Sequence, residues 1–143
     1  LMILTSNQSG YWKNNVTLWN HAVNVTRNNT IAHSKLGHAY AELGQYPMAI
    51  THYKKAIQLN PNYWVPYNRL GIAYSHLNQY QLALDHYNKA IFLKPDASDA
   101  YHNRANVHFI QGNIAEGCHD AKKACSMGVC AALEAAKSEG YCR

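Results

Sequence analysis

One pattern of residues is written twice between positions 30 and 97. The second copy follows the first at one constant spacing, with Leu36-Gly37, Tyr40, Ala49, Tyr53, Ala56 and Pro61 becoming Leu70-Gly71, Tyr74, Ala83, Tyr87, Ala90 and Pro95. A fixed period of this length indicates a repeat architecture, in which each unit buries its apolar face only by stacking on its neighbours.

Each copy of the pattern predicts a pair of helices. Pro61 and Pro95 end the second helix of each pair, because proline cannot continue a helix and disfavours helix in the residue before it. Gly37 and Gly71 fall at the eighth position of the first helix, where the lack of a Cβ lets a neighbouring helix approach closely. The expected helices span residues 30–43, 46–59, 64–77 and 80–93.

The period, together with its small, aromatic and proline positions, resembles the tetratricopeptide repeat. The resemblance implies an all-α fold, a right-handed superhelix of antiparallel helix pairs with a C-terminal capping helix. We expect a single domain over residues 1–143. Its parts are a lead-in and half repeat (1–29), repeat 1 (30–63), repeat 2 (64–97), a degenerate repeat 3 (98–128), and a capping helix with its tail (129–143).

The segments on either side of the regular repeats depart from the pattern. Residues 6–14 are expected to form a loop that leads into a helix over residues 15–27, where Trp19 takes the position of Tyr53. In repeat 3 the glycine of the first helix becomes Ala105, and the terminal proline is absent. Terminal repeats are often atypical, because one of their faces has no neighbouring repeat.

The four cysteines all lie near the C-terminus. Cys118, Cys125, Cys130 and Cys142 lack the paired C-x-x-C spacing of zinc and redox sites. An even, clustered set suits two disulfides in an oxidising compartment, and four reduced thiols are the alternative. In the stack that the resemblance implies, an antiparallel capping helix over residues 129–138 would pair Cys118 with Cys142 and Cys125 with Cys130. The sequence by itself allows three connectivities.

Composition and motifs argue against several classes of function. The formal charge is +5, but no run of Lys or Arg exceeds a pair, so we expect no nucleic-acid partner. The nine histidines form no H-E-x-x-H motif, and there is no glycine-rich phosphate-binding loop. We therefore expect no enzymatic activity, no metal site and no cofactor.

The expected functional surface is a groove that holds a protein or peptide ligand. In the family layout the first helix of each pair lines the concave side, and the residues that we expect to contact the partner are Ser34, His38, Glu42, Asn68, Ile72, His76, His102, Asn106 and Phe109. Family members that grip a peptide C-terminal carboxylate carry Lys and Asn at the positions of Ser34 and His38. This departure argues against a receptor for chaperone tails.

A second resemblance concerns the segment from position 1 to position 40. The run Tyr11-Trp12-Lys13-Asn14-Asn15, followed by Leu18-Trp19 and His21-Ala22, resembles a junction found in polytopic membrane proteins, often of the lipid-linked-sugar glycosyltransferase type. It implies an extracytoplasmic repeat tail, on the periplasmic or lumenal side, tethered through the chain upstream of residue 1. The apolar Leu1–Leu4 is much shorter than the roughly 20 residues of a membrane-spanning helix. It is either the exit of such a helix or a short lead-in.

Three functions remain open at this point. The leading hypothesis is a non-catalytic interaction module on the extracytoplasmic side of a membrane protein, for which weak self-association is also allowed. The alternatives are an accessory domain that positions the acceptor of a membrane glycosyltransferase, and a cytoplasmic scaffold with reduced cysteines. A titration of free thiols in protein from its native compartment separates the last from the others, because a cytoplasmic scaffold would have four.

Overall fold

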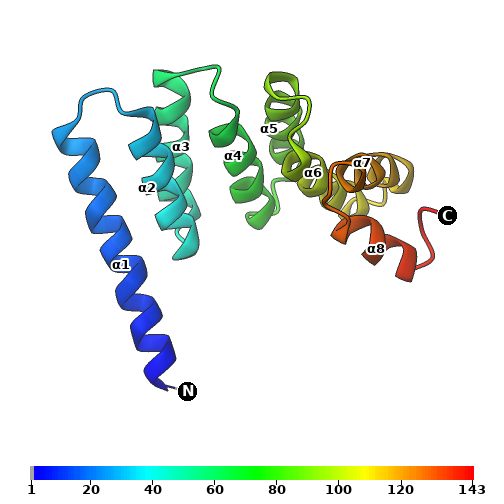
Figure 1. The fold of residues 1–143 in the computed structure, drawn as a ribbon, viewed down its shortest axis with the longest axis horizontal. Coiled ribbons are helices and arrows are strands. Elements are labelled where there is room, and N and C mark those ends of the chain that lie inside the picture. Colours follow the sequence, from blue (N-terminus) through cyan, green and yellow to red (C-terminus); the bar gives the residue numbers. More distant parts are fainter. Residues whose placement is uncertain (1) are drawn as a thin grey trace. The chain divides into compact units, whose positions relative to one another are not determined.

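The regular structure of the chain is helical throughout the part that can be described. The computed structural model describes the backbone of residues 2–143 and the side chains from residue 13 onward. Its helices are α1 (Met2–Val25), α2 (Thr30–Glu42), α3 (Tyr46–Leu59), α4 (Trp64–His76), α5 (Tyr80–Leu93), α6 (Ser98–Ile110), α7 (Ile114–Ser126) and α8 (Ala131–Ser138) (Figure 1). This confirms the all-α expectation, and α2 to α5 begin at the expected residues and end within one residue of the expected ends.

The first helix differs from the expectation. α1 is continuous from Met2 to Val25, so the prediction of a loop over residues 6–14 was wrong. That prediction relied on the polar residues of the segment, but the segment contains no proline, and a single interior glycine such as Gly10 costs a helix only about 1 kcal/mol. Residue 1 and the side chains of residues 2–12 lie outside the description, and with them the apolar Leu1–Leu4 and the Tyr11-Trp12 part of the second resemblance.

The helix pairs are closed by one recurring turn. At the end of α2, Gly44 adopts a left-handed φ of 73°, its N–H donates to the Ala41 carbonyl, and the Gln45 N–H donates to the Tyr40 carbonyl. This is the Schellman arrangement, which satisfies carbonyls at the end of a helix. Asn78 takes the same role after α4, with a φ of 57°.

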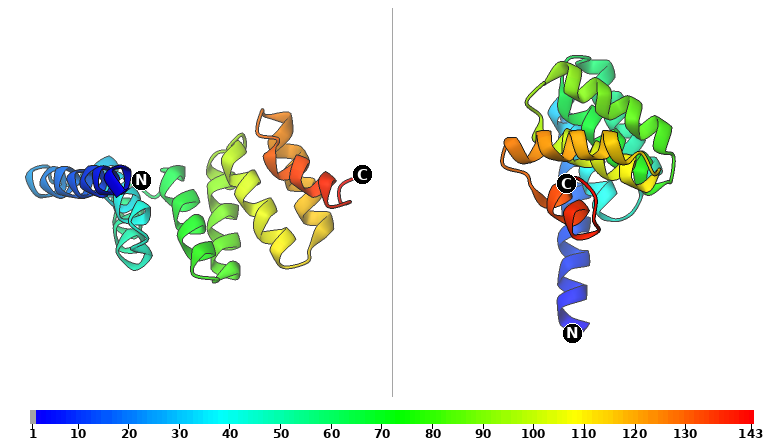
Figure 2. Two further views of the ribbon diagram at one scale, coloured as in Figure 1. Left: turned by 90° about the horizontal axis from the view of Figure 1, so that it is seen from below. Right: turned by 90° about the vertical axis from the view of Figure 1, so that its right-hand side faces the viewer.

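The chain divides into two compact units, Leu1–Arg69 and Leu70–Arg143, and the boundary falls within α4. In the first unit α2 packs against both α1 and α3. In the second unit α6 packs against α5 and α7, and α8 packs against α7 and α6 (Figures 1 and 2). The packing of consecutive antiparallel helices, which the repeat predicts, is therefore present within each unit.

The two helical glycines of the regular repeats make room for a tyrosine ring. A Cβ built on Gly37 would lie 2.7 Å from Cε1 of Tyr53, and one built on Gly71 would lie 2.3 Å from Cε1 of Tyr87. Both tyrosines are almost fully buried, so their rings have little room to move aside. The close-approach role predicted for Gly37 and Gly71 is thus confirmed.

Repeat 3 achieves the same close approach with the roles of its helices reversed. Ala105 and Ala121 stand where the regular repeats have glycine and tyrosine, and both are fully buried. The glycine is instead Gly117 on α7, and the ring is Phe109 on α6, whose Cε1 would lie 2.5 Å from a Cβ on Gly117. The degeneracy of this repeat is therefore an exchange of which helix supplies the bulky side chain.

The C-terminal segment is held to the last repeat by two disulfides. They join Cys118 to Cys142 and Cys125 to Cys130, the same pairs that an antiparallel capping helix implies. The capping helix begins at Ala131, two residues later than expected. Among the described residues, no helix has the length and apolar character needed to cross a lipid bilayer.

Candidate functional site

On α2, the groove positions differ in how much of each side chain solvent can reach. Ser34 is only 6% exposed, whereas the side chains of His38 and Glu42 are 37% and 28% exposed. His38 Nε2 lies 3.3 Å from the Glu42 carboxylate, one helical turn away. Partial burial, and then the positive charge of Arg69, lower the pKa of His38 despite Glu42. The imidazole is therefore neutral at pH 7, and it can donate one N–H to the carboxylate.

On α4, Asn68 is only 7% exposed, Ile72 is half-buried and His76 is exposed. Ser34 and Asn68 occupy the same repeat position and are both nearly covered, because a short side chain at this position does not reach past its neighbours. Both are therefore left out of the proposed contact surface, although the sequence places them on the expected face.

On α6, His102 and Phe109 are half-buried and Asn106 is exposed. His102 Nε2 and Asn106 Nδ2 lie 3.2 Å apart, so Asn106 donates to the imidazole when His102 carries its proton on Nδ1. Phe109 stacks on Tyr141, with ring centroids 6.4 Å apart and an interplanar angle of 13°. Ile110, the next residue, is 60% exposed.

A cavity of about 380 Å³ opens between α6 and α8, and two of the expected groove residues line it. Its walls are Asn106, Phe109, Ile110, Ala132, Ala135, Ala136, Glu139 and Tyr141. A larger cavity of about 480 Å³ lies against the turn between α1 and α2 and the end of α3, but it contains none of the expected residues. We place the candidate site at the α6–α8 cavity, because it combines the expected face with an apolar recess.

Sequence reasoning missed the contribution of the tail to this cavity. Tyr141 follows the last helix, and the Cys118–Cys142 disulfide fixes the residue next to it to α7. Glu139 caps the C-terminal end of α8. Neither residue belongs to the repeat pattern. The expected pairing of Cys118 with Cys142 brought the tail back to repeat 3, but it gave no role to the residues between α8 and Cys142.

Repeat 3 also contains a buried ion pair that the regular repeats lack. Arg104 donates from Nε and Nη2 to the two carboxylate oxygens of Asp120, at 2.6 and 2.7 Å, and from Nη1 to Asn88 at 2.7 Å. Asp120 is 2% exposed. Arg104 stands one full repeat period after Leu70, which is buried. An arginine at a position where the regular repeat buries a leucine was the sequence signal for a buried ion pair. The pair links α6 to α7 and α5.

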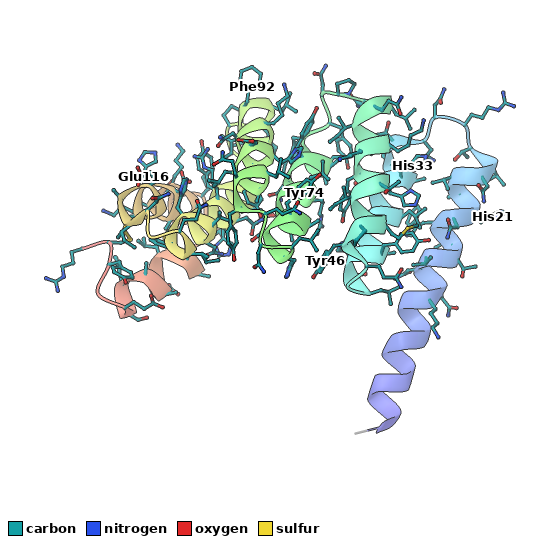
Figure 3. The ribbon with its side chains drawn as sticks, turned by 180° about the vertical axis from the view of Figure 1, so that it is seen from behind. His21, His33, Tyr46, Tyr74, Phe92 and Glu116 are labelled. Carbon is teal, nitrogen blue, oxygen red and sulfur yellow. A yellow bond between two sulfur atoms is a disulfide. The ribbon has the colours of Figure 1, made fainter. Side chains whose placement is uncertain are left out.

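The ion pair borders a second cavity of about 340 Å³, which His108, Ala115, Glu116 and His119 also line. Glu116, which Figure 3 labels on α7, is exposed to solvent. Across the described residues, no three His, Cys, Asp or Glu side chains converge in a way that could hold a metal ion. Because Arg104 and Asp120 satisfy each other, we interpret this cluster as structural.

Two histidines of the first unit form a hydrogen bond between their rings. The Nδ1 atoms of His33 on α2 and His52 on α3 lie 3.2 Å apart, and their ring centroids lie 5.5 Å apart. The two nitrogens therefore point at each other, so one donates and the other accepts. Burial lowers the pKa of both, and the pair's own positive charge opposes double protonation, as the effect of His33 on His52 shows.

The depressed pKa values predict that stability falls as the solution is acidified. Below the ordinary histidine pKa of 6.5, the unfolded chain binds protons that the folded His33–His52 pair resists, so the free energy of unfolding decreases as the pH falls from 6.5. Urea unfolding between pH 7 and pH 5 measures this slope.

A single variant assigns the slope to these rings. His52→Gln removes one of the two imidazoles and should flatten the pH dependence. Equal slopes in the wild type and His52→Gln would contradict the assignment.

A family model matches the two regular repeats of the chain. The family model of the tetratricopeptide repeat matches residues 30–63 and 65–97. No curated protein matches the sequence. The absence of repeat 3 from the family match is consistent with its reversed glycine and aromatic positions.

Several solved structures have the same fold. The crystal structure of MamA has a TM-score of 0.75 and 24% identity, over 87% of this chain and 72% of that chain. A MamA RS-1 ArsTM double mutant has a TM-score of 0.74 and 22% identity, over 87% and 70%. The first tetratricopeptide-repeat domain of Spaghetti (RPAP3), bound to the HSP90 peptide SRMEEVD, has a TM-score of 0.68 and 23% identity, over 69% and 79%. The chain thus contains tetratricopeptide repeats and has their fold, which is generally that of a non-enzymatic interaction module.

Proposed function

We propose that the chain is a non-catalytic interaction module that binds a protein or peptide segment on the first-helix face of its last repeat. The observation that carries the proposal is the α6–α8 cavity, where Asn106, Phe109 and Ile110 of a first helix border an open apolar recess. One solved neighbour with the same fold is bound to a peptide, which supports this kind of ligand.

The chemistry of the contact surface favours a segment read through its side chains. The expected face has no lysine or arginine among its residues, and His38 is neutral at pH 7 because its pKa is lowered. A peptide carboxylate needs a cationic or multiple N–H donor to offset its loss of hydration. An acidic chaperone tail is therefore a poor fit, and an apolar anchor is a better one.

The test uses peptides selected from a random library against the whole chain. Ile110→Ser on α6 should weaken binding by about fivefold or more, because a buried interface anchor contributes about 1 kcal/mol or more. Leu82→Ser on α5 is the matched control, since Leu82 is also an exposed aliphatic residue but lies on a second helix. Fluorescence anisotropy gives both affinities. A larger loss with Leu82→Ser would overturn the proposed face.

We place the module in an oxidising, extracytoplasmic compartment, as the tail of a membrane protein. The two disulfides at the C-terminus support the compartment. The tether depends on the resemblance of the N-terminal segment, positions 1 to 40, and stays a prediction. Thiol titration of protein from its native compartment should find no free thiol, and four free thiols would favour the cytoplasmic scaffold.

A further inference from the structure

The α6–α8 cavity has an apolar floor built from small side chains. Ala132, Ala135 and Ala136 of α8 leave space that the aromatic rings of Phe109 and Tyr141 border. Ala132 and Ala136 are buried, while Ala135 is exposed at the opening. At about 380 Å³, the cavity can accept a leucine, phenylalanine or tryptophan side chain from outside. Such a side chain would be removed from water on binding, which favours the complex.

The cavity walls have few polar groups, and the one charged group among them is negative. Apart from the hydroxyl of Tyr141, Asn106 and Glu139 are the only polar side chains among its walls, and Glu139 is the only charged one. Glu139 is exposed and lies just past the end of α8. A carboxylate at the edge of an apolar recess attracts a cation from a bound partner and repels an anion.

We infer that this cavity seats one bulky apolar side chain of a partner segment that carries Lys or Arg close to that side chain, where it pairs with Glu139. The inference rests on the proposed function and adds the chemistry of the partner to it. Its occupant is a basic, apolar stretch of another polypeptide, argued from the charge of the only ionised wall residue and from the apolar character of the rest.

The aromatic wall of the cavity depends on a covalent bond. Tyr141 lies between Gly140, which has a left-handed φ of 90°, and Cys142, which is bonded to Cys118 on α7. Besides that bond, the Tyr141 N–H donates to the Ala136 carbonyl at 2.8 Å, and the Tyr141 ring stacks on Phe109. Loss of the disulfide therefore removes one of three restraints and should loosen the aromatic wall of the recess.

The test compares the sequences that the wild type and its variants select from a random peptide library. The wild type should enrich bulky apolar residues next to Lys or Arg. Ala135→Leu fills the cavity and should remove the apolar preference. Ala131→Leu adds the same side chain to an exposed position of α8 that does not line the cavity, and it should select the same peptides as the wild type.

Reversing the charge of Glu139 tests whether the partner segment carries a basic residue next to its apolar side chain. Glu139→Lys should turn the neighbouring preference from basic to acidic residues, and a lysine is well tolerated there because it lies at a helix C-terminus. Glu134→Lys makes the same change in charge on an exposed residue of α8 outside the cavity, and it should leave the preference basic. Removing the disulfide by Cys118→Ser with Cys142→Ser should weaken the apolar preference.

The outcomes separate this inference from the proposed function. Selected peptides that lose affinity with Ile110→Ser but show no bulky apolar residue, or that ignore Ala135→Leu, would overturn the inference and leave the proposed function intact. A bulky apolar preference with no basic neighbour, unchanged by Glu139→Lys, would overturn the assigned role of Glu139. No selected peptide binding at all would overturn both proposals.

Discussion

Gly71→Leu is expected to lower the free energy of unfolding by about 3 kcal/mol or more, as measured by urea denaturation. The new Cβ alone would lie 2.3 Å from Cε1 of Tyr87, far inside contact distance. Tyr87 is 2% exposed, so its ring cannot swing into solvent. Overpacking a tight contact typically costs about 1–3 kcal/mol, and here the two helices of the pair must also separate.

Two comparisons show whether the cost comes from this contact. Gln79→Leu adds the same side chain at an exposed position and should change stability by less than about 0.5 kcal/mol. Gly71→Ala should destabilise the wild type but be neutral or stabilising in a Tyr87→Ala background, since alanine favours helix by about 1 kcal/mol over glycine once the ring is gone. The same cost in both backgrounds would mean that the ring is not what requires glycine.

Asp120→Asn is expected to destabilise the chain by about 3 kcal/mol. It removes the charge that two donors of Arg104 contact at 2.6 and 2.7 Å, and the guanidinium is only 19% exposed. Breaking a buried pair by changing one partner typically costs about 3–5 kcal/mol, because the other charge is left without compensation. We take the lower value because Arg104 retains some access to water and its bond to Asn88.

The residues of a regular repeat at the same positions should restore the lost stability. Repeat 2 has leucine, tyrosine and histidine at the positions of Arg104, His108 and Asp120. The triple variant Arg104→Leu, His108→Tyr and Asp120→His should recover most of the stability that Asp120→Asn loses, because buried ion pairs are often replaced by well-packed groups without loss. A triple variant less stable than Asp120→Asn would show that repeat 3 needs the ion pair for its packing.

The regular part of the fold was predictable because local and repeating signals agree there. Pro61 and Pro95 end helices, Gly44 and Asn78 close turns, and the constant period fixes which positions meet. The same kind of reasoning failed on residues 6–14, where polar composition was taken as a loop. Polar residues without proline are compatible with a helix, so composition alone does not decide between the two.

Repeat 3 shows what a positional pattern cannot detect. Its packing keeps one glycine against one ring, but Gly117 and Phe109 supply them from the opposite helices. Ala105 was therefore taken as a departure from the pattern, although the contact is preserved by other residues. A pattern that assigns each role to a fixed position detects only that the expected residue is missing there.

The candidate site was predictable in part for a similar reason. Position counting placed Asn106 and Phe109 on the exposed first-helix face, and both line the α6–α8 cavity. It could not show that Ser34 is covered by its surroundings, since burial depends on side-chain length and on neighbours. Glu139 and Tyr141 were missed because they follow the last helix and have no counterpart in the repeat pattern.

The most direct test of the account is to map a bound peptide by NMR on the isotope-labelled wild-type chain. Titration with a library-selected peptide should shift the amide resonances of α6 and α8 around the cavity. Shifts confined to the second helices α3, α5 and α7 would contradict the proposal that the first-helix face is the binding surface.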